Sequence, residues 1–121
     1  MDMRSPASFW DYLEELVVSS PVIIDRPKGT HHPRYPELVY ALDYGYLEGT
    51  VAADGSGIDP WLGASGCRDL SAVLMTVDLH KRDTEIKILP GCTAEEIQTK
   101  LDFHNTKSMR AFLVRRPAKN R

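Results

Sequence analysis

The stretch 42–59 constrains this chain most, because it joins a Tyr-Gly-Tyr strand to a glycine-rich turn that carries two carboxylates. In the segment DGSGID, Gly55 and Gly57 allow backbone conformations that other residues rarely adopt, so the turn can be tight while Asp54 and Asp59 point to one side. Such a pair suits Mg²⁺, which is usually held by one or two carboxylates together with a phosphate. The alternative is a surface turn in which both aspartates only accept backbone hydrogen bonds.

Hydrophobic periodicity predicts short strands with one helix near each end of the chain. Residues 79–83 form a short connection between two apolar runs, so these runs should pair as a hairpin. Thr93 followed by Glu96 is a capping box, which marks the start of the second helix. The predicted elements are a helix over residues 6–18, strands over 22–26 and 44–46, a hairpin of 70–78 with 84–89, a helix from Thr93 to Asn105, a strand over 109–116, and loops over 27–36 and 60–69.

Length, charge and cysteine content restrict the class of protein. A chain of 121 residues predicts one domain, residues 1–121. The net charge of -2 predicts no broad basic surface for nucleic acid. No apolar run reaches the roughly 18–20 residues that span a bilayer, and carboxylates interrupt the N-terminal segment where a signal peptide would lie. Cys67 and Cys92 have no paired spacing, so we expect buried free thiols in a cytoplasmic protein.

The central stretch resembles the signature of the family I soluble inorganic pyrophosphatases. In that family a YGY or YGF strand leads into the acidic motif DGDPxD. The positions that match in register are Tyr44, Gly45, Tyr46, Thr50, Asp54, Gly55 and Asp59. The resemblance runs in order over about residues 22–83, roughly half of the chain.

Further matches lie on both sides of this stretch. Before it, Asp25 stands in the acidic position of the family's V-x-x-E-x-P strand, and Arg34-Tyr35 replaces a Lys-Tyr pair. Arg34 is therefore a candidate to bind phosphate, with a solvated loop arginine as the alternative. After it, Asp78 and Asp83 end the predicted hairpin at the separation of two metal-binding aspartates of the family.

The chain also departs from the family pattern. Ser56 stands where the family has the middle aspartate, which activates the attacking water, and Gly57 replaces the proline. Glu85 stands at the position of an active-site lysine, although Lys81, Arg82 and Lys87 are close in sequence, and Lys87 is the candidate among them to bind the substrate. The family's hairpin with a phosphate-binding arginine has no counterpart. Its terminal Tyr-Lys pair has only Lys107 as a candidate substitute.

The resemblance implies Mg²⁺-dependent hydrolysis of inorganic pyrophosphate or a related phosphoanhydride. In this interpretation Asp54, Asp59 and Tyr44 are catalytic, and Arg34, Tyr44 and Lys87 bind the substrate. The metal ligands are five carboxylates, Asp25, Asp54, Asp59, Asp78 and Asp83. Grouped carboxylates repel one another unless a cation neutralises them, so their grouping itself favours a bound cation.

The same resemblance implies an α+β fold that is mainly β, a small OB-like five-stranded β-barrel flanked by an N-terminal and a C-terminal helix. A plain α+β sandwich is the alternative. Because of the departures, the alternative function is a catalytically weak or inactive module that binds a metal-phosphate or nucleotide ligand. We expect a small phosphorylated substrate as partner, neither nucleic acid nor membrane, and leave a homo-oligomer open.

Overall fold

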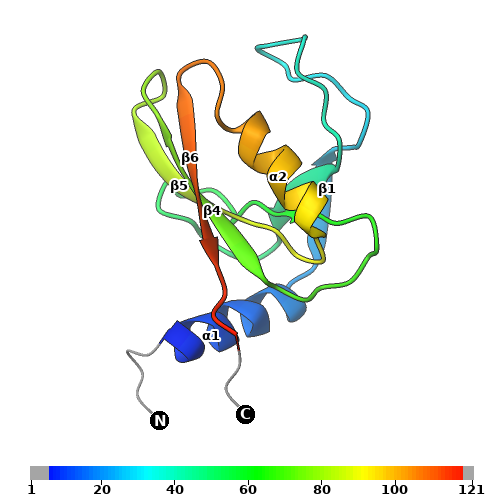
Figure 1. Cartoon of the computed structure of the whole chain (residues 1–121), viewed down its shortest axis with the longest axis vertical. Coiled ribbons are helices and arrows are strands. Elements are labelled where there is room, and N and C mark those ends of the chain that lie inside the picture. Colours follow the sequence, from blue (N-terminus) through cyan, green and yellow to red (C-terminus); the bar gives the residue numbers. More distant parts are fainter. Residues whose placement is uncertain (1–5, 119–121) are drawn as a thin grey trace.

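Figure 1 shows the fold in a computed structural model, which describes residues 6–118. The elements are α1 (Pro6–Val18), β1 (Val22–Arg26), β2 (Asp43–Leu47), β3 (Trp61–Leu62), β4 (Ala72–Asp78), β5 (Asp83–Ile88), α2 (Ala94–Phe103) and β6 (Met109–Arg115). Every helix and strand expected from the sequence is confirmed, with ends that differ by at most two residues. The short strand β3 was not expected, because it lies within the predicted loop 60–69. No helix in the described part of the chain is long and apolar enough to cross a membrane.

The strands form two antiparallel sheets, with the orders β1-β2-β3 and β5-β4-β6. A single parallel bridge, Pro60 with Ile88, links them, and the Ile88 amide donates to the Asp59 carbonyl at 3.2 Å. The α+β class is therefore confirmed, but the predicted five-stranded barrel is wrong for residues 6–118. The physical reason is the shortness of β3, whose two residues pair only with β2, so one bridge replaces the continuous ladder that closure requires.

The glycine of the Tyr-Gly-Tyr strand is required by the packing of β1 against β2. Gly45 pairs with Ile24, and a Cβ atom on Gly45 would collide with the Ile23 carbonyl. Glycine is the residue that permits such a close approach of two backbones. The structure thus requires glycine at position 45 for steric reasons.

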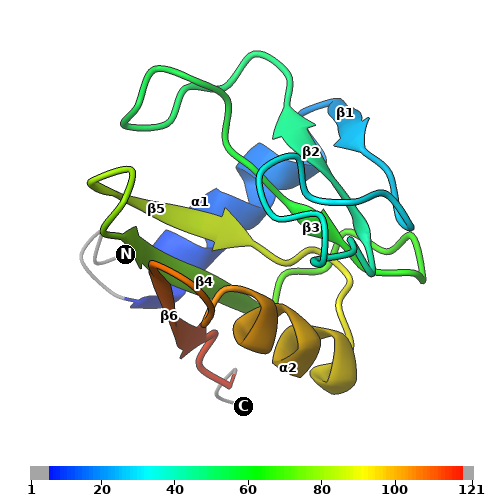
Figure 2. The same cartoon turned by 90° about the horizontal axis from the view of Figure 1, so that it is seen from above.

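Two hydrophobic clusters lie on opposite faces of the β5-β4-β6 sheet. Because side chains alternate along a strand, Leu74 of β4 packs in the cluster that includes Ile97 of α2, whereas Val73 packs in the cluster that includes Trp10 and Val17 of α1. Figure 2 shows this arrangement, with the sheet between the two helices. The two clusters therefore hold β4 from both of its faces, and the cluster on the α1 side also holds Ile88 of β5.

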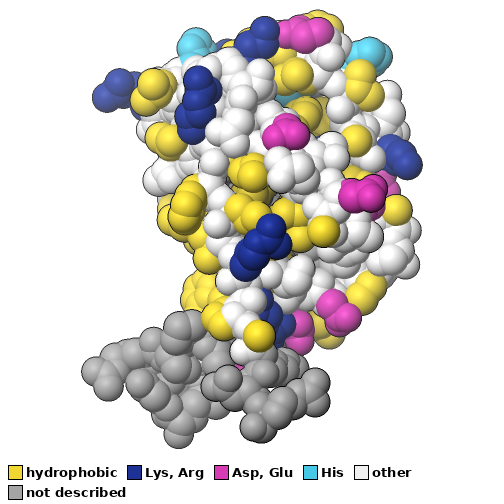
Figure 3. Space-filling view, in the orientation of Figure 1, with side chains coloured by type: hydrophobic (Ala, Val, Ile, Leu, Met, Phe, Trp, Pro, Cys, Tyr) yellow, Lys and Arg dark blue, Asp and Glu magenta, His cyan; other side chains and the backbone are white. Residues whose placement is uncertain are grey.

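The helix α1 covers only one end of its sheet face. Beyond that end, Met75 pairs with Ile86 and with Phe112, and the three side chains stay exposed. Figure 3 shows one face of the molecule, on which hydrophobic side chains alternate with charges of both signs.

Cys67 is also exposed, so the expectation of two buried thiols is wrong for this residue. Cys67 and Cys92 are both free.

Replacing Thr93 with alanine is expected to lower the free energy of unfolding by about 1 kcal/mol, because the capping box is formed. The Thr93 hydroxyl accepts from the Glu96 amide at 3.1 Å, and the Glu96 carboxylate accepts from the Thr93 amide at 2.8 Å. Urea denaturation measures the change. Thr99→Ala is the matched control on the same helix and should change stability by less than about 0.5 kcal/mol. Equal losses in both variants would contradict the capping role.

Candidate active site

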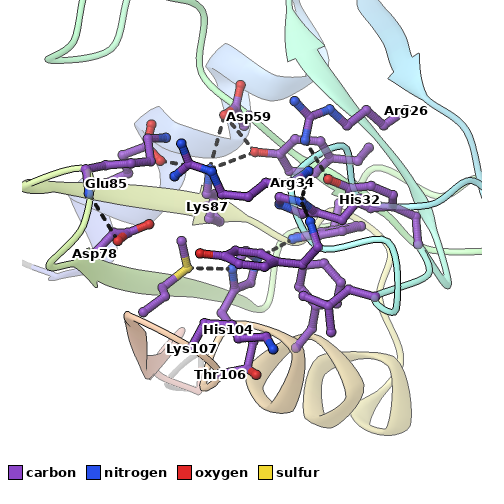
Figure 4. A pocket seen from close by; sticks show the side chains of 18 of the residues that line it. Arg26, His32, Arg34, Asp59, Asp78, Glu85, Lys87, His104, Thr106 and Lys107 are labelled. Atoms are coloured by element: carbon purple, nitrogen blue, oxygen red, sulfur yellow. Dashed lines mark hydrogen bonds and ion pairs between the residues drawn. The ribbon is translucent and has the colours of Figure 1, made fainter.

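A pocket of about 470 Å³ opens between β2, β5 and the segment that follows α2. The loop 27–42 contributes a further wall through His32, Arg34 and Tyr35. Figure 4 shows Asp59, Glu85 and Lys87 on one side of this pocket and Thr106 and Lys107 on the other.

The pocket brings together most of the residues that the sequence singled out. Its lining includes seven of the eight predicted site residues, namely Asp25, Arg34, Tyr44, Asp54, Asp59, Asp78 and Lys87. Asp83 does not line the pocket; its carboxylate lies 3.5 Å from the ammonium group of Lys81 in the β4–β5 hairpin. Ser56, the position of the largest departure from the family motif, also lines the pocket, as Asp54 and Asp59 do.

Four side chains form a connected polar network in the pocket. The hydroxyl of Tyr44 donates to Asp59 Oδ2 at 2.7 Å. The Lys87 ammonium donates to Tyr44 Oη at 2.7 Å and to Asp59 Oδ2 at 3.2 Å, and lies 2.9 Å from Glu85 Oε2. Burial and the nearby Asp59 carboxylate raise the pKa of Tyr44 well above its usual value, so its hydroxyl keeps its proton. Tyr44 can therefore position groups but is not a base.

The local sequence explains how this network forms. Glu85 and Lys87 are two residues apart in β5, so their side chains leave the same face of the strand. Tyr44 is on β2, and Asp59 directly precedes the bridge between the two sheets. Glu85 was predicted only as a departure from the family, although the two-residue spacing of a strand contained the signal for its pairing with Lys87.

The glycine-rich turn holds its two aspartates in different ways. Asp54 Oδ1 accepts from the Ser56 amide at 3.0 Å, and Gly55 has a φ of 87°, which favours glycine. Thr50 fixes the end of the turn, because its hydroxyl accepts from the Ile58 amide at 3.0 Å. The alternative in which aspartates only accept backbone hydrogen bonds thus describes Asp54, whereas Asp59 bonds to side chains.

Asp78 stabilises the β4–β5 turn from inside the pocket. Its Oδ1 accepts from the amides of His80 and Lys81 at 2.9 and 3.3 Å and from the Ser108 hydroxyl at 2.7 Å. Burial raises the pKa of Asp78, but these hydrogen bonds outweigh burial and leave the pKa below its usual value. Asp78 therefore stays ionised, with one of its oxygens fully engaged.

The bulge in β1 and the following loop supply the two arginines of the pocket, Arg26 and Arg34. The register of β1 shifts between Ile24 and Arg26, at Asp25, and such bulges redirect side chains. Arg26 donates to the Tyr40 hydroxyl at 2.6 Å. Within residues 6–118, no hydrogen bond or ion pair holds the guanidinium group of Arg34. Arg26 and Tyr40 were not predicted as site residues, since neither belongs to a motif.

A neutral histidine organises the tip of this loop. His32 Nδ1 accepts from the amides of Arg34 and Tyr35 at 3.0 and 3.1 Å, so this nitrogen carries no proton. Burial, together with the charges of Arg26 and Arg34, lowers the pKa of His32. Across the pocket, Lys107 forms an ion pair of 2.8 Å with Glu37 and thereby links the loop to the segment after α2.

Trp61 forms the floor beneath the network and is fully buried. Its indole Nε1 donates to His104 Nε2 at 2.8 Å, and burial, reinforced by nearby cations such as Lys87, lowers the pKa of His104 to about 3. The Lys100 ammonium lies 3.9 Å from the Trp61 ring centre and has no hydrogen-bond partner in the described chain. Burial lowers the pKa of Lys100 to about 8.

The carboxylates of the pocket do not form a cage for a resident metal ion. Among residues 6–118, no three His, Cys, Asp or Glu side chains are grouped to hold one. Asp59 and Glu85, which approach the same point, both contact the Lys87 ammonium there. The remaining acidic lining includes Asp25 and Asp54.

The fold is similar to that of solved inorganic pyrophosphatases. The structure of the enzyme from Helicobacter pylori superimposes with a TM-score of 0.54 and 15% sequence identity, covering 78% of this chain and 81% of that one. The inorganic phosphatase from Anaplasma phagocytophilum gives 0.52 and 15% over 78% and 81% of the two chains. The inorganic pyrophosphatase from Coxiella burnetii gives 0.51 and 13% over 78% and 82%.

At these identities the likeness shows a shared fold. No protein-family model matches the sequence, and no curated protein does.

Proposed function

We propose that this protein hydrolyses inorganic pyrophosphate, or a related phosphoanhydride, presented as its magnesium complex. One observation carries the proposal: a fold shared with inorganic pyrophosphatases places Tyr44, Asp54, Asp59 and Lys87 in one pocket. Magnesium enters the pocket as part of the substrate, since phosphate oxygens and one or two carboxylates suffice to hold it. Of the five carboxylates that the sequence suggested as metal ligands, Asp25 and Asp54 are then the two that face the ion.

Each remaining residue has a role that its contacts support. The guanidinium of Arg34, which has no partner within residues 6–118, binds phosphate, for which its planar donors are suited. Tyr44, held by Asp59 and Lys87, fixes the position of a phosphate oxygen or of the attacking water. Asp54 keeps one carboxylate oxygen without a described partner and is the group that orients this water.

A second candidate is binding of the same ligand without hydrolysis. Ser56 favours it, because a serine hydroxyl in the pocket cannot take a proton from water near neutral pH as a carboxylate can.

A cytoplasmic location also stays a prediction. The two free cysteines support it, because free thiols persist in reducing compartments.

The direct test is phosphate release from pyrophosphate at high enzyme concentration, with and without magnesium. We expect slow turnover above background that requires magnesium. Calorimetric titration with magnesium pyrophosphate measures binding in parallel. Binding without turnover would replace the first candidate with the second, and absence of both would contradict the two candidates together.

A further inference from the structure

Lys87 is unusual among the cations of this pocket because it is buried. Only 7% of its side chain is exposed, against 55% for Lys81 at the pocket rim. Its ammonium has three oxygen partners, on Tyr44, Asp59 and Glu85. Pairing and hydrogen bonding of this kind offset the cost of burying an ammonium group.

Two carboxylates surround the Lys87 ammonium, as they would surround a bound cation. Asp59 and Glu85 each bring one negative charge to within 3.2 and 2.9 Å of the same nitrogen. Two carboxylates brought this close repel one another unless a cation lies between them. Of the carboxylates that the sequence grouped around a cation, Asp59 therefore has its cation within the chain itself, and it shares this cation with Glu85.

We propose that the Lys87 ammonium is the resident cation of this site and excludes a resident divalent metal ion from the position between Asp59 and Glu85. If the proposed function holds, metal enters this pocket only together with a phosphate ligand; the exclusion of a resident metal ion by Lys87 does not depend on that function. The side chain also makes the acidic wall less repulsive toward an anionic ligand, because one of its two negative charges is already neutralised.

The geometry gives this proposal a measurable consequence. A divalent ion such as Mg²⁺ needs oxygens at roughly 2.0–2.1 Å. The Asp59 and Glu85 oxygens lie 3.2 and 2.9 Å from the ammonium nitrogen, so each has to move by only about 1 Å to reach an ion placed there. Removing the charge of Lys87 should therefore convert the pair into a metal site.

The test is binding of Mn²⁺, without any substrate, to the full chain and to Lys87→Met. We expect wild-type protein to bind no Mn²⁺ up to about 1 mM, and Lys87→Met to bind one ion with a dissociation constant roughly tenfold or more below this limit. The melting temperature of Lys87→Met should rise with Mn²⁺, since a ligand of the folded state stabilises it. Electron paramagnetic resonance of free Mn²⁺ measures the binding, independently of hydrolysis.

Two controls assign the new site. Lys81→Met removes a cation from the rim of the same pocket and should gain no Mn²⁺ site. The double variant Lys87→Met with Glu85→Gln should lose the gained site. Wild-type binding as tight as that of Lys87→Met, or no gain in Lys87→Met, would overturn the proposal. If Lys87→Met folds only in the presence of Mn²⁺, this result supports the proposal. If the variant folds neither with nor without Mn²⁺, Lys87→Gln takes its place in the same comparison, with the same criteria.

Discussion

Replacing Ser56 with aspartate is expected to raise pyrophosphate hydrolysis by about 10- to 100-fold. The new carboxylate would enter the pocket that Asp54 and Asp59 also line, where it can take a proton from the attacking water. A positioned general base typically contributes a factor of roughly 10²–10⁴ to the rate, and an imperfectly placed one contributes less. The carboxylate should also tighten the binding of magnesium pyrophosphate, because it adds an anionic oxygen ligand.

Two further variants separate this effect from a general change in charge. Ser71→Asp adds the same charge at an exposed position outside the pocket lining and should leave the rate within about twofold. Asp59→Asn should lower the rate, because Asp59 holds both Tyr44 and Lys87. Rates of phosphate release and calorimetric affinities are the measurements. An unchanged rate and affinity in folded Ser56→Asp would show that residue 56 does not face the substrate, and the pyrophosphatase likeness would then be one of fold alone.

Acid is expected to unfold this protein through His104. The pKa of His104 is about 3 in the folded protein, chiefly because burial disfavours the charged ring, against about 6.5 in the unfolded chain. The unfolded state therefore binds a proton at a higher pH than the folded state, and stability is lost as pH falls below about 6.5. At about pH 4.5 the loss amounts to roughly 2–3 kcal/mol.

His104→Gln isolates this contribution. The glutamine side chain can still accept a hydrogen bond from the Trp61 indole, as His104 Nε2 does, but it does not titrate. Urea denaturation between about pH 7.5 and 4.5 should show the smaller loss of stability in the variant. His32, whose pKa is also lowered, titrates in both proteins and cancels in the comparison. Equal losses in the two proteins would contradict the role of His104.

The sequence was sufficient for the elements that depend on local pattern. The capping box at Thr93 and the hairpin of β4 with β5 were predicted because periodicity and capping are read from neighbouring residues. It was insufficient for β3, since two residues show no period, and for closure of the barrel, which depends on pairing between distant strands. The resemblance to the family implied a closed barrel, which residues 6–118 do not form.

For the site, motif residues were predictable and their electrostatic partners were not. Tyr44, Asp54 and Asp59 belong to one short stretch, and the structure places all three in one pocket. The neutralisation of Asp59 by Lys87 joins residues 28 positions apart. The bond between Trp61 and His104 spans 43 positions. Such contacts follow from the packing of β5 and α2, which no local pattern specifies.

The two tryptophans of this chain are divided between its two hydrophobic clusters. Trp10 of α1 belongs to one cluster and Trp61, beneath the pocket, to the other. Their indole fluorescence can therefore be separated by Trp10→Phe and Trp61→Phe, so that each single-tryptophan protein reports on one side of the sheet. Coincident transitions in the two proteins are the signature of an all-or-none unfolding reaction, whereas separate transitions mean that the α1 side and the pocket side unfold as independent cooperative units.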